Sequence, residues 1–242
     1  MKPVWTTWSE SRRFGEPDPF ERELGATFLA WIFHELWGRP ATVLDVGTGR
    51  GKVALEIAPR AREVVGLDID AEAIAEAAAL AQRHALRQAR FAVADCETAD
   101  LLEASGLRNP ADLITMHLCV SEPMIHRAAQ ALRPGGALVG VAHEASRWNE
   151  TGMPSRFAAT TDQLGEALGH AGLAIEQGRI ETSVMHFQDA AECERYLRDG
   201  HHLLPWQRNG RWESWKKRLA AKPRAPIALT RSHLVFLARR GV

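Results

Sequence analysis

The feature that most constrains the fold is a glycine-rich turn in the first quarter of the chain. It follows residues 42–46, which are of the buried type and carry Asp45, and it precedes a helix start at Lys52. Three alternating glycines form the turn: Gly47, Gly49 and Gly51. Glycine tolerates positive φ and has no Cβ, so a ligand can approach the backbone closely. The first turn of the following helix leaves N–H groups without partners at the same place. The stretch therefore predicts a strand, a tight turn and a helix that together bind a nucleotide-like ligand.

The spacing of these glycines bears on which nucleotide binds. The dinucleotide fingerprint has glycine at its first, third and sixth positions. Counted from Gly47, the sixth position is Lys52, and the third glycine is displaced to Gly51. A pyridine nucleotide is therefore disfavoured. The chain also lacks the Gly-x-x-x-x-Gly-Lys-Ser/Thr phosphate loop and the Gly-x-Ser-x-Gly elbow of serine hydrolases.

An aspartate two residues before Gly-x-Gly-x-Gly, at the end of a strand, resembles motif I of the class I S-adenosylmethionine-dependent methyltransferases. The "LRPGG" of residues 132–136 and the "AGL" of residues 171–173 are similar to segments that precede the fifth and sixth strands of that family. The order of the predicted elements extends the resemblance over nearly the whole chain. It implies S-adenosyl-L-methionine as cofactor and S-adenosyl-L-homocysteine as product.

The hydrophobic pattern predicts strands alternating with helices. The strands are expected at 42–46, 63–68, 90–93, 111–118, 137–142, 173–180 and 232–238. Such alternation favours parallel strands joined by right-handed crossovers, which is an α/β doubly wound sheet. The family resembled has seven strands, with the seventh antiparallel between the fifth and sixth. We therefore expect a mostly parallel seven-stranded sheet whose last strand is antiparallel.

The length of 242 residues suits one large α/β domain. Residues 1–40 are expected to form an irregular arm, up to residue 17, and then a helix over about 19–37. Residues 41–143 would form the cofactor-binding core. Residues 144–242 would form the substrate side, with a helical cap inserted between strands six and seven at about 185–230.

The resemblance places the cofactor at the carboxyl ends of the first strands, where open α/β sheets bind ligands. Asp68 ends the second strand about twenty residues after the turn, the interval at which a carboxylate accepts both ribose hydroxyls. Ile69 would pack on the adenine, and Asp95 would meet the adenine amino group beside the Cys96 backbone. Asp45 would hold the amino-acid ammonium, directly or through water, or would only brace the turn. The full predicted set is Asp45, Gly47, Thr48, Gly49, Gly51, Asp68, Ile69, Asp95, Cys96 and His117.

Methyl transfer is an in-line displacement that needs the acceptor held close to the methyl group in a water-poor pocket. No metal is expected, because the histidines and cysteines lack metal-ligand spacing. An oxygen or protonated nitrogen acceptor needs a base, and His117 or His143 is the candidate because imidazole titrates near neutrality. The family's Asn/Asp-Pro-Pro-Tyr signature is absent after residue 117, so methylation of exocyclic base amines is disfavoured. The acceptor atom, O, N or C, stays open.

The acceptor is expected to be a small molecule that binds on the cap side. Aromatic faces there would attract a sulfonium or another cation. The candidate substrate residues are Trp5, Trp8, His143, Trp148, His201 and Trp206. Each of them also has an ordinary packing interpretation.

A basic stretch over 208–224 is interleaved with Trp212 and Trp215. Basic and aromatic residues together can bind nucleic acid. Because Trp212, Trp215 and Leu219 share a helix face, the charges can equally be the solvated side of a docked helix, or can hold an acidic small molecule. The alternatives to a small-molecule methyltransferase are therefore an RNA or protein methyltransferase and a non-catalytic protein that binds S-adenosyl-L-methionine.

The composition is that of an ordinary globule with a formal net charge of zero. The three cysteines, Cys96, Cys119 and Cys193, are far apart and are expected to be free thiols. The sequence shows no secretory leader pattern and no apolar run long enough to span a bilayer. We expect a cytoplasmic protein with no membrane partner.

Overall fold

A computed structural model of the chain describes residues 5–14, 24–153, 157–199, 202–221 and 227–242. Its strands are β1 (Trp5–Arg13), β2 (Thr42–Val46), β3 (Glu63–Asp68), β4 (Ala89–Val93), β5 (Ala111–His117), β6 (Leu132–Glu144), β7 (Ala158–Ala159), β8 (Leu173–Phe187) and β9 (Ile227–Arg240). Its longer helices are α2 (Ala26–Leu36), α4 (Ala71–Arg83), α6 (Glu122–Ala131), α7 (Thr161–His170), α8 (Ala190–Asp199) and α10 (Arg211–Ala221). The shorter ones are α3 (Lys52–Ile57), α5 (Leu101–Ser105), α9 (Leu203–Arg208), η1 (Ala58–Arg60) and η2 (Asn149–Thr151).

The strands form one mixed sheet of nine, in the order β1-β8-β9-β6-β5-β2-β3-β4, with the short β7 beside β6. The pairs from β4 to β6 are parallel. As expected, β9 runs antiparallel between β6 and β8. The α/β fold with a mostly parallel sheet is therefore confirmed, but the expected number of seven strands was wrong.

The first of the two additional strands is β1, which pairs in parallel with β8. The expectation of an irregular arm was therefore wrong for residues 5–13. The strand β1 forms because β8 runs to Phe187 rather than to residue 180. The longer β8 has an edge of backbone N–H and C=O groups that need partners, and β1 supplies them. The second additional strand, β7, adds only two residues beside the end of β6.

Several helices begin at residues whose side chains cap the first turn. Asp70 accepts hydrogen bonds from the N–H groups of Glu72 and Ala73, at 2.9 and 3.1 Å, and begins α4. Thr160 forms a capping box with Gln163 at the start of α7. The predicted start of the N-terminal helix, near residue 19, lies outside the described residues. The helix α9 was not predicted.

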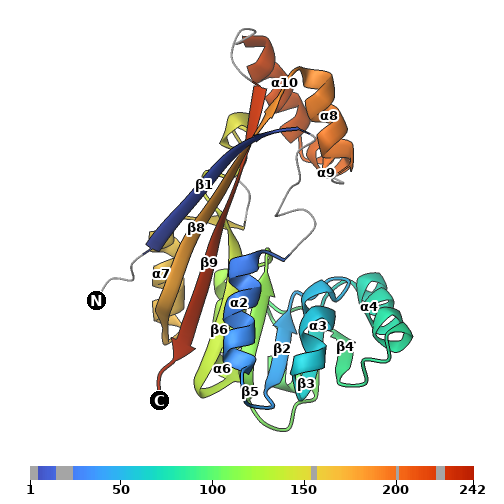
Figure 1. The fold of residues 1–242 in the computed structure, drawn as a ribbon, viewed down its shortest axis with the longest axis vertical. Coiled ribbons are helices and arrows are strands. Elements are labelled where there is room, and N and C mark those ends of the chain that lie inside the picture. Colours follow the sequence, from blue (N-terminus) through green and yellow to red (C-terminus); the bar gives the residue numbers. More distant parts are fainter. Residues whose placement is uncertain (1–4, 15–23, 154–156, 200–201, 222–226) are drawn as a thin grey trace.

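Helices cover both faces of the sheet (Figure 1). The buried side chains of α2 and α3, including Phe28 and Ile32, form the core on one face. Those of α5, α6 and α7, including Met124 and Leu164, form the core on the other face. Both faces of the central strands are thus buried, which explains why all five residues of β2 are buried, including Thr42 and Asp45.

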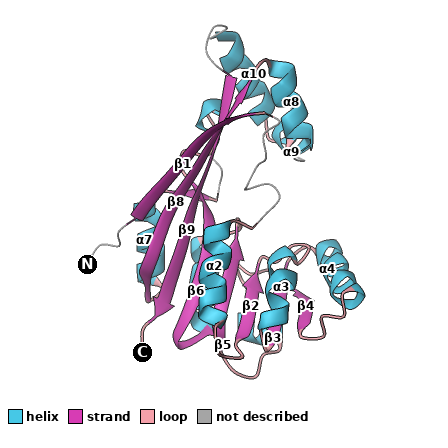
Figure 2. Ribbon diagram, viewed as in Figure 1, coloured by secondary structure: helices cyan, strands magenta, loops and turns pink. Residues whose placement is uncertain are grey.

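The helices α8, α9 and α10 follow β8 and precede β9, and they pack on the far ends of these two long strands (Figure 2). We call this group, residues 190–199 and 202–221, the helical lobe. Its core is rich in aromatic side chains: Trp148, Phe187, Tyr196, Trp206, Trp212 and Trp215. Lys216 and Lys217 on α10 are exposed while Trp212 and Trp215 are buried. In this stretch α10 is thus a docked helix with exposed lysines on its outer side, an arrangement that both the solvated-face and the nucleic-acid interpretations share.

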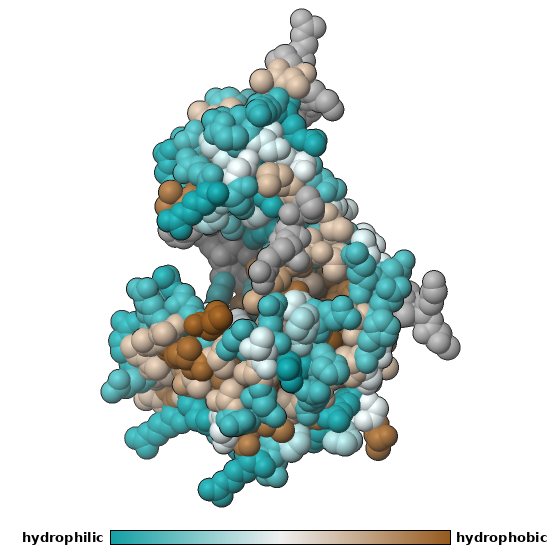
Figure 3. Space-filling model, turned by 180° about the vertical axis from the view of Figure 1, so that it is seen from behind, coloured by the Kyte–Doolittle hydropathy of each residue, from teal (hydrophilic) through white to brown (hydrophobic). Residues whose placement is uncertain are grey.

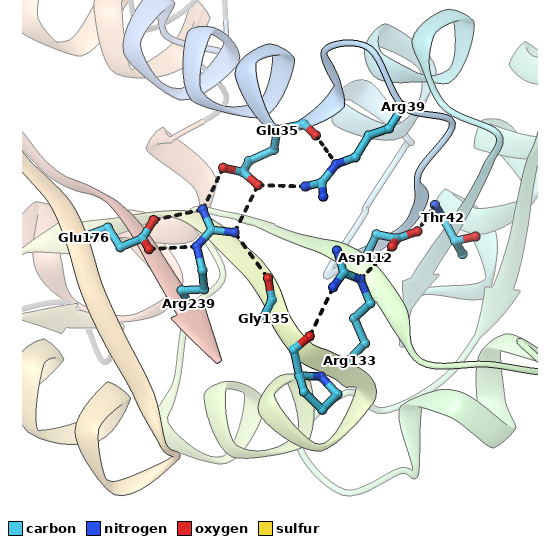
Figure 4. A network of polar contacts seen from close by, with 9 residues as sticks. Glu35, Arg39, Thr42, Asp112, Arg133, Gly135, Glu176 and Arg239 are labelled. Atoms are coloured by element: carbon cyan, nitrogen blue, oxygen red, sulfur yellow. Dashed lines mark hydrogen bonds and ion pairs between the residues drawn. The ribbon is translucent and has the colours of Figure 1, made fainter. Parts of the chain in front are cut away.

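A polar network ties α2 to the sheet at the amino ends of the parallel strands (Figure 4). Arg239 on β9 donates to Glu35 on α2 and to Glu176 on β8, with shortest distances of 2.8 and 2.7 Å. Burial alone would raise the pKa of Glu35, but the hydrogen bond and charge of Arg239 hold it below its ordinary value. Beside this network, Asp112 accepts from Arg133 and from the N–H of Thr42. These contacts fasten the end of the sheet that lies opposite the glycine turn.

Candidate cofactor and acceptor site

The three glycines of the turn all adopt left-handed backbone conformations, with φ of 71°, 52° and 77° at positions 47, 49 and 51. They serve different purposes. A Cβ at Gly51 would lie 2.9 Å from the Cβ of Ala77, so this glycine allows α3 to pack against α4. A Cβ at Gly49 would meet nothing within 4 Å. Gly49 therefore presents its backbone to open space, where a ligand can approach.

Asp68 connects the end of β3 to this turn. Its Oδ2 accepts a hydrogen bond of 2.7 Å from the N–H of Gly49, and its Oδ1 accepts one of 3.0 Å from the N–H of Asp70. A carboxylate oxygen has two lone pairs, so each can accept a further bond. The carboxylate is thus fixed in position while it keeps the capacity to bind ribose hydroxyls.

Asp45 lies on the inner side of the turn and is only 1% exposed. The hydroxyls of Thr48 and Thr115 donate to its two oxygens at 2.6 and 2.7 Å. Burial raises the pKa of Asp45 to about 6, although these hydrogen bonds oppose the shift. This geometry is that of a carboxylate that braces the turn, which was the alternative to a contact with the cofactor ammonium. The Thr48 side chain is buried with it, so only the Thr48 backbone can reach a ligand.

A cavity of about 210 Å³ lies at the carboxyl ends of β2, β3, β4 and β5. Five of the predicted cofactor residues line it: Gly47, Asp68, Ile69, Asp95 and Cys96. Ile69 is 67% exposed, which is unusual for an isoleucine and suits a side chain that packs on a flat ring. Four lining residues were not in the predicted set: Glu97, Cys119, Met124 and Phe157. Cys119 could have been found, because it closely follows the end of the fourth predicted strand.

The turn after β4 orders Asp95 and Cys96. Asp95 Oδ1 accepts a hydrogen bond of 3.0 Å from the N–H of Glu97. Burial raises the pKa of the Cys96 thiol to about 11, so the group is neutral at physiological pH. A neutral thiol of this kind packs as a small apolar group.

His117 does not line this cavity. Its ring lies on the α2 side of the sheet, with its centroid 5.2 Å from that of Phe28. Burial and then the charge of Lys52 lower the pKa of His117 to about 4. The next residue, Leu118, has a φ of 61°. Leu118 separates two residues that lie in different places. His117, before it, is on the α2 side of the sheet, and Cys119, after it, lines the cofactor cavity.

His143 belongs to a row of polar side chains that crosses four strands. Registers pair His143 with His233, His233 with Glu181, and Glu181 with Trp8. Directly paired residues share a face of the sheet, so these four lie on the same face. We call His143, His233, Glu181 and Trp8 the polar row. Burial, and then the charges of Arg147 and Arg231, lower the pKa of His143 to about 2. Within the described residues, the Nδ1 atom of His143 has no hydrogen-bond partner.

The other predicted substrate residues are distributed over the molecule. Trp148 and Trp206 are in edge contact in the core of the helical lobe, with ring centroids 4.9 Å apart. Trp8 lies in the polar row, but Trp5 lies on the opposite face, where it covers Gly178. His201 lies outside the described residues. Trp8 and His143 are thus at the two ends of one row, three strand spacings or about 14 Å apart. Trp148 and Trp206 lie beside each other.

Among the described residues, no group of three or more His, Cys, Asp or Glu side chains is arranged to hold a metal ion. No helix in the same part of the chain has the length and apolar character that crossing a bilayer requires.

Comparisons with known proteins agree with this geometry. Residues 43–136 match a family model described as a methyltransferase domain. The methyltransferase ptaI of Pestalotiopsis fici is 34% identical over 145 residues, which cover 55% of this chain and 40% of that protein. The tRNA 5-carboxymethoxyuridine methyltransferase of Escherichia coli K12 is 30% identical over 112 residues, which cover 44% of this chain and 42% of that protein. The chain therefore spans less than half the length of either relative.

The fold has solved counterparts as well. The crystal structure of the YcgJ protein from Bacillus subtilis covers 89% of this chain and 99% of its own, with a TM-score of 0.66 and 17% sequence identity. At that identity the likeness concerns the fold alone. The glycine turn, the carboxylates at the next two strand ends and the family match lead to one conclusion: residues 43–136 form a methyltransferase domain, which supports S-adenosyl-L-methionine as the cofactor of a class I methyltransferase.

Proposed function

We propose that the protein transfers a methyl group from S-adenosyl-L-methionine to a small-molecule acceptor. The observation that carries this proposal is the convergence of Gly47, Asp68, Ile69 and Asp95 on one cavity at the carboxyl ends of the parallel strands. We propose one domain over residues 1–242, with residues 41–143 binding the cofactor. Residues 144–242 would bind the acceptor, with residues 185–230 as the cap.

The residues of the cavity have separate tasks in this proposal. When bound, S-adenosyl-L-methionine supplies an electrophilic methyl group on a sulfonium. Asp68 accepts hydrogen bonds from the ribose hydroxyls, Ile69 packs on the adenine, and Asp95 meets the adenine amino group. Gly49 leaves room for the ligand against the backbone. Asp45 holds the turn in shape through Thr48 and Thr115.

His117 and His143 are the candidate bases, and both are neutral at pH 7 because burial lowers their pKa values to about 4 and 2. A neutral imidazole accepts a hydrogen bond and orients a nucleophile, but such a low pKa makes it a weak base. This favours an acceptor whose nucleophile needs little or no deprotonation. A carboxylate oxygen, a neutral amine and a carbon nucleophile meet that condition.

An RNA acceptor is the second candidate, and a specific observation favours it. Exposed basic residues lie on or next to α10: Arg208, Lys216, Lys217 and Arg218. One relative is named for a tRNA substrate. Binding of RNA through these residues would weaken steeply as salt concentration rises.

Transfer from radiolabelled S-adenosyl-L-methionine tests the proposal directly. The purified protein is incubated separately with a pool of small metabolites and with total RNA. Label in the small-molecule fraction that survives 0.5 M salt supports the proposal. Salt-sensitive label in RNA supports the second candidate. Binding of S-adenosyl-L-homocysteine without transfer to either pool would contradict both and favour a non-catalytic binding protein.

A further inference from the structure

We propose that the end of the sheet opposite the cofactor cavity binds a small organic phosphate through Arg62, Arg90 and Arg108. This site is separate from the one that would transfer the methyl group, so it goes beyond the proposed function. Three observations support it: a cavity that the three arginines line, an excess of positive charge in that cavity, and contacts that hold two of the arginines in place.

The cavity has a volume of about 300 Å³ and lies at the amino ends of the parallel strands β2, β3 and β4. Thr42, the first residue of β2, lines it, whereas Gly47, which follows the last residue of β2, lines the cofactor cavity. The residues of β2 span about 16 Å, so the two cavities lie at opposite ends of this strand. The amino ends of these strands point down in Figure 1, and hydrophilic side chains extend from this lower end of the molecule in Figure 3.

The lining of this cavity carries an excess of positive charge. Beside the three arginines, its only charged residue is Glu63, which accepts a hydrogen bond of 2.8 Å from Nε of Arg90. Arg62 also lies 4.0 Å from Asp112, but Arg133 binds that carboxylate more closely, at 2.7 Å. Four arginines therefore face two carboxylates, which leaves two positive charges in excess.

Two of the guanidinium groups are held in fixed positions. Arg90 donates from Nη1 to the carbonyl of Ser105 and from Nε to Glu63. Arg62 donates from Nη2 to the hydroxyl of Thr42. A guanidinium has five N–H donors, so each of these arginines keeps several for a ligand. Planar guanidinium groups with free donors suit phosphate, because two parallel hydrogen bonds can reach two of its oxygens.

The third arginine and its neighbour supply donors that no described residue uses. Arg108 and Asn109 follow the left-handed Gly106 in the loop after α5, and both line the cavity. Within the described part of the chain, neither side chain forms a hydrogen bond or an ion pair. The Arg108 guanidinium and the Asn109 amide are therefore available to a bound anion.

A neighbouring cavity gives room for the organic part of the ligand. It has a volume of about 580 Å³, and Arg90 lines both cavities. Apart from Gln82, Arg87 and Arg90, its lining is apolar and consists of Leu86, Phe91 and four alanines. A molecule whose phosphate lies between the arginines can place an apolar or aromatic body against Leu86 and Phe91. The two cavities together therefore suit an organic phosphate better than free inorganic phosphate.

The amount of charge favours a phosphate over a carboxylate. A phosphate monoester carries a charge of about −1.5 to −2 at pH 7, whereas a carboxylate carries a single negative charge. The monoester thus matches the excess of two positive charges more closely. An RNA backbone would instead need basic side chains spread over several phosphates, and the arginines of this site converge on one cavity.

Binding of organic phosphates tests the inference. The probes are phenyl phosphate and uridine 5′-monophosphate, compared with phenol, with uridine and with inorganic phosphate. Titration calorimetry on the full chain is performed at low ionic strength, with and without saturating S-adenosyl-L-homocysteine. We expect at least one organic phosphate to bind at least tenfold more tightly than its unphosphorylated counterpart and than inorganic phosphate. Its affinity should not change when S-adenosyl-L-homocysteine is present, because the cofactor cavity is at the other end of the sheet.

The variants Arg62→Gln and Arg108→Gln should each weaken that phosphate at least tenfold, while affinity for S-adenosyl-L-homocysteine stays within twofold. Because Arg108 has no partner among the described residues, its replacement should leave the fold intact. Arg108→Lys keeps the charge and should retain part of the binding. Arg198→Gln removes an exposed arginine of the helical lobe, and this matched control should change neither affinity.

Three outcomes would overturn the inference. In the first, no organic phosphate binds more tightly than its unphosphorylated counterpart, or inorganic phosphate binds equally well. In the second, Arg62→Gln and Arg108→Gln keep the wild-type affinity. In the third, S-adenosyl-L-homocysteine displaces the organic phosphate, which would place that ligand in the cofactor cavity. Failure of the wild-type protein to bind S-adenosyl-L-homocysteine would concern the proposed function alone, so the two failures can be told apart.

Discussion

The N–H of Gly49 donates a hydrogen bond of 2.7 Å to Oδ2 of Asp68, so the carboxylate at the end of β3 also holds the glycine turn at the end of β2. One side chain thereby joins the two parts of the cofactor cavity. A ribose bound by Asp68 would consequently lie against the Gly49 backbone, where a Cβ would meet nothing within 4 Å.

Replacing Asp68 with alanine should weaken the binding of S-adenosyl-L-homocysteine at least tenfold. A hydrogen bond to a charged group is worth about 1.5–3 kcal/mol, and two such bonds to the ribose would be lost. Titration calorimetry measures the effect. Asp100→Ala is the matched control, because Asp100 also accepts from two backbone N–H groups but only caps α5. The control should lose about 1 kcal/mol of stability and keep its affinity. Equal affinities in both variants would refute the assignment of Asp68.

Alanine at Gly49 and at Gly51 should have opposite consequences. Both positions are left-handed, which costs a non-glycine residue about 1–2 kcal/mol. At Gly51 the new Cβ also collides with Ala77 and with Phe91, at 2.9 and 3.0 Å, so Gly51→Ala should lose about 3 kcal/mol of unfolding free energy. Gly49→Ala should lose only this conformational cost of about 1–2 kcal/mol, but it should bind S-adenosyl-L-homocysteine poorly. Urea denaturation and calorimetry on both variants check this, and the reverse pattern would contradict it.

Asp45→Asn should remove a pH dependence of stability. The pKa of Asp45 is raised by burial to about 6 in the folded protein, above its ordinary value of 3.8. The folded state therefore holds the proton more tightly than the unfolded state, and the stability from this group is lost as pH rises through 6. Between pH 4 and pH 7, the wild type should lose about 2 kcal/mol relative to Asp45→Asn. Unfolding free energies of both proteins across that range give the difference, and parallel curves would show that Asp45 has no raised pKa.

His117→Asn should lower kcat at pH 7 at least tenfold while the affinity for S-adenosyl-L-homocysteine stays unchanged. The reason is that His117 would contact the acceptor rather than the cofactor, since it does not line the cofactor cavity. Because the pKa of His117 is lowered to about 4, the wild-type kcat should not fall between pH 7.5 and 5.5. His126→Asn, an exposed histidine on α6, is the control. A wild-type profile that falls near pH 6.5 would contradict this account of His117.

The central part of the fold could be predicted because its signals are local. A strand such as 63–68 depends on residues close in sequence, and it is found where it was expected. The antiparallel last strand was inferred from the family resemblance and is confirmed by its registers with β6 and β8.

The remainder depended on long-range contacts. The strand β1 is stabilised by pairing with β8, more than 170 positions later in the chain, and its own sequence gives no sign of that partner. The side on which His117 lies depends on the left-handed Leu118 that follows it, which no residue pattern predicts. Arg147, which donates a hydrogen bond to His233, comes from the loop after β6, so only the folded chain brings these two residues together.

The most direct test of the cofactor assignment is titration calorimetry of the unmodified protein with S-adenosyl-L-homocysteine and, separately, with a pyridine dinucleotide. The account predicts saturable binding of one S-adenosyl-L-homocysteine per chain and no heat of binding with the dinucleotide. Absence of binding to S-adenosyl-L-homocysteine, or tighter binding of the dinucleotide, would contradict it.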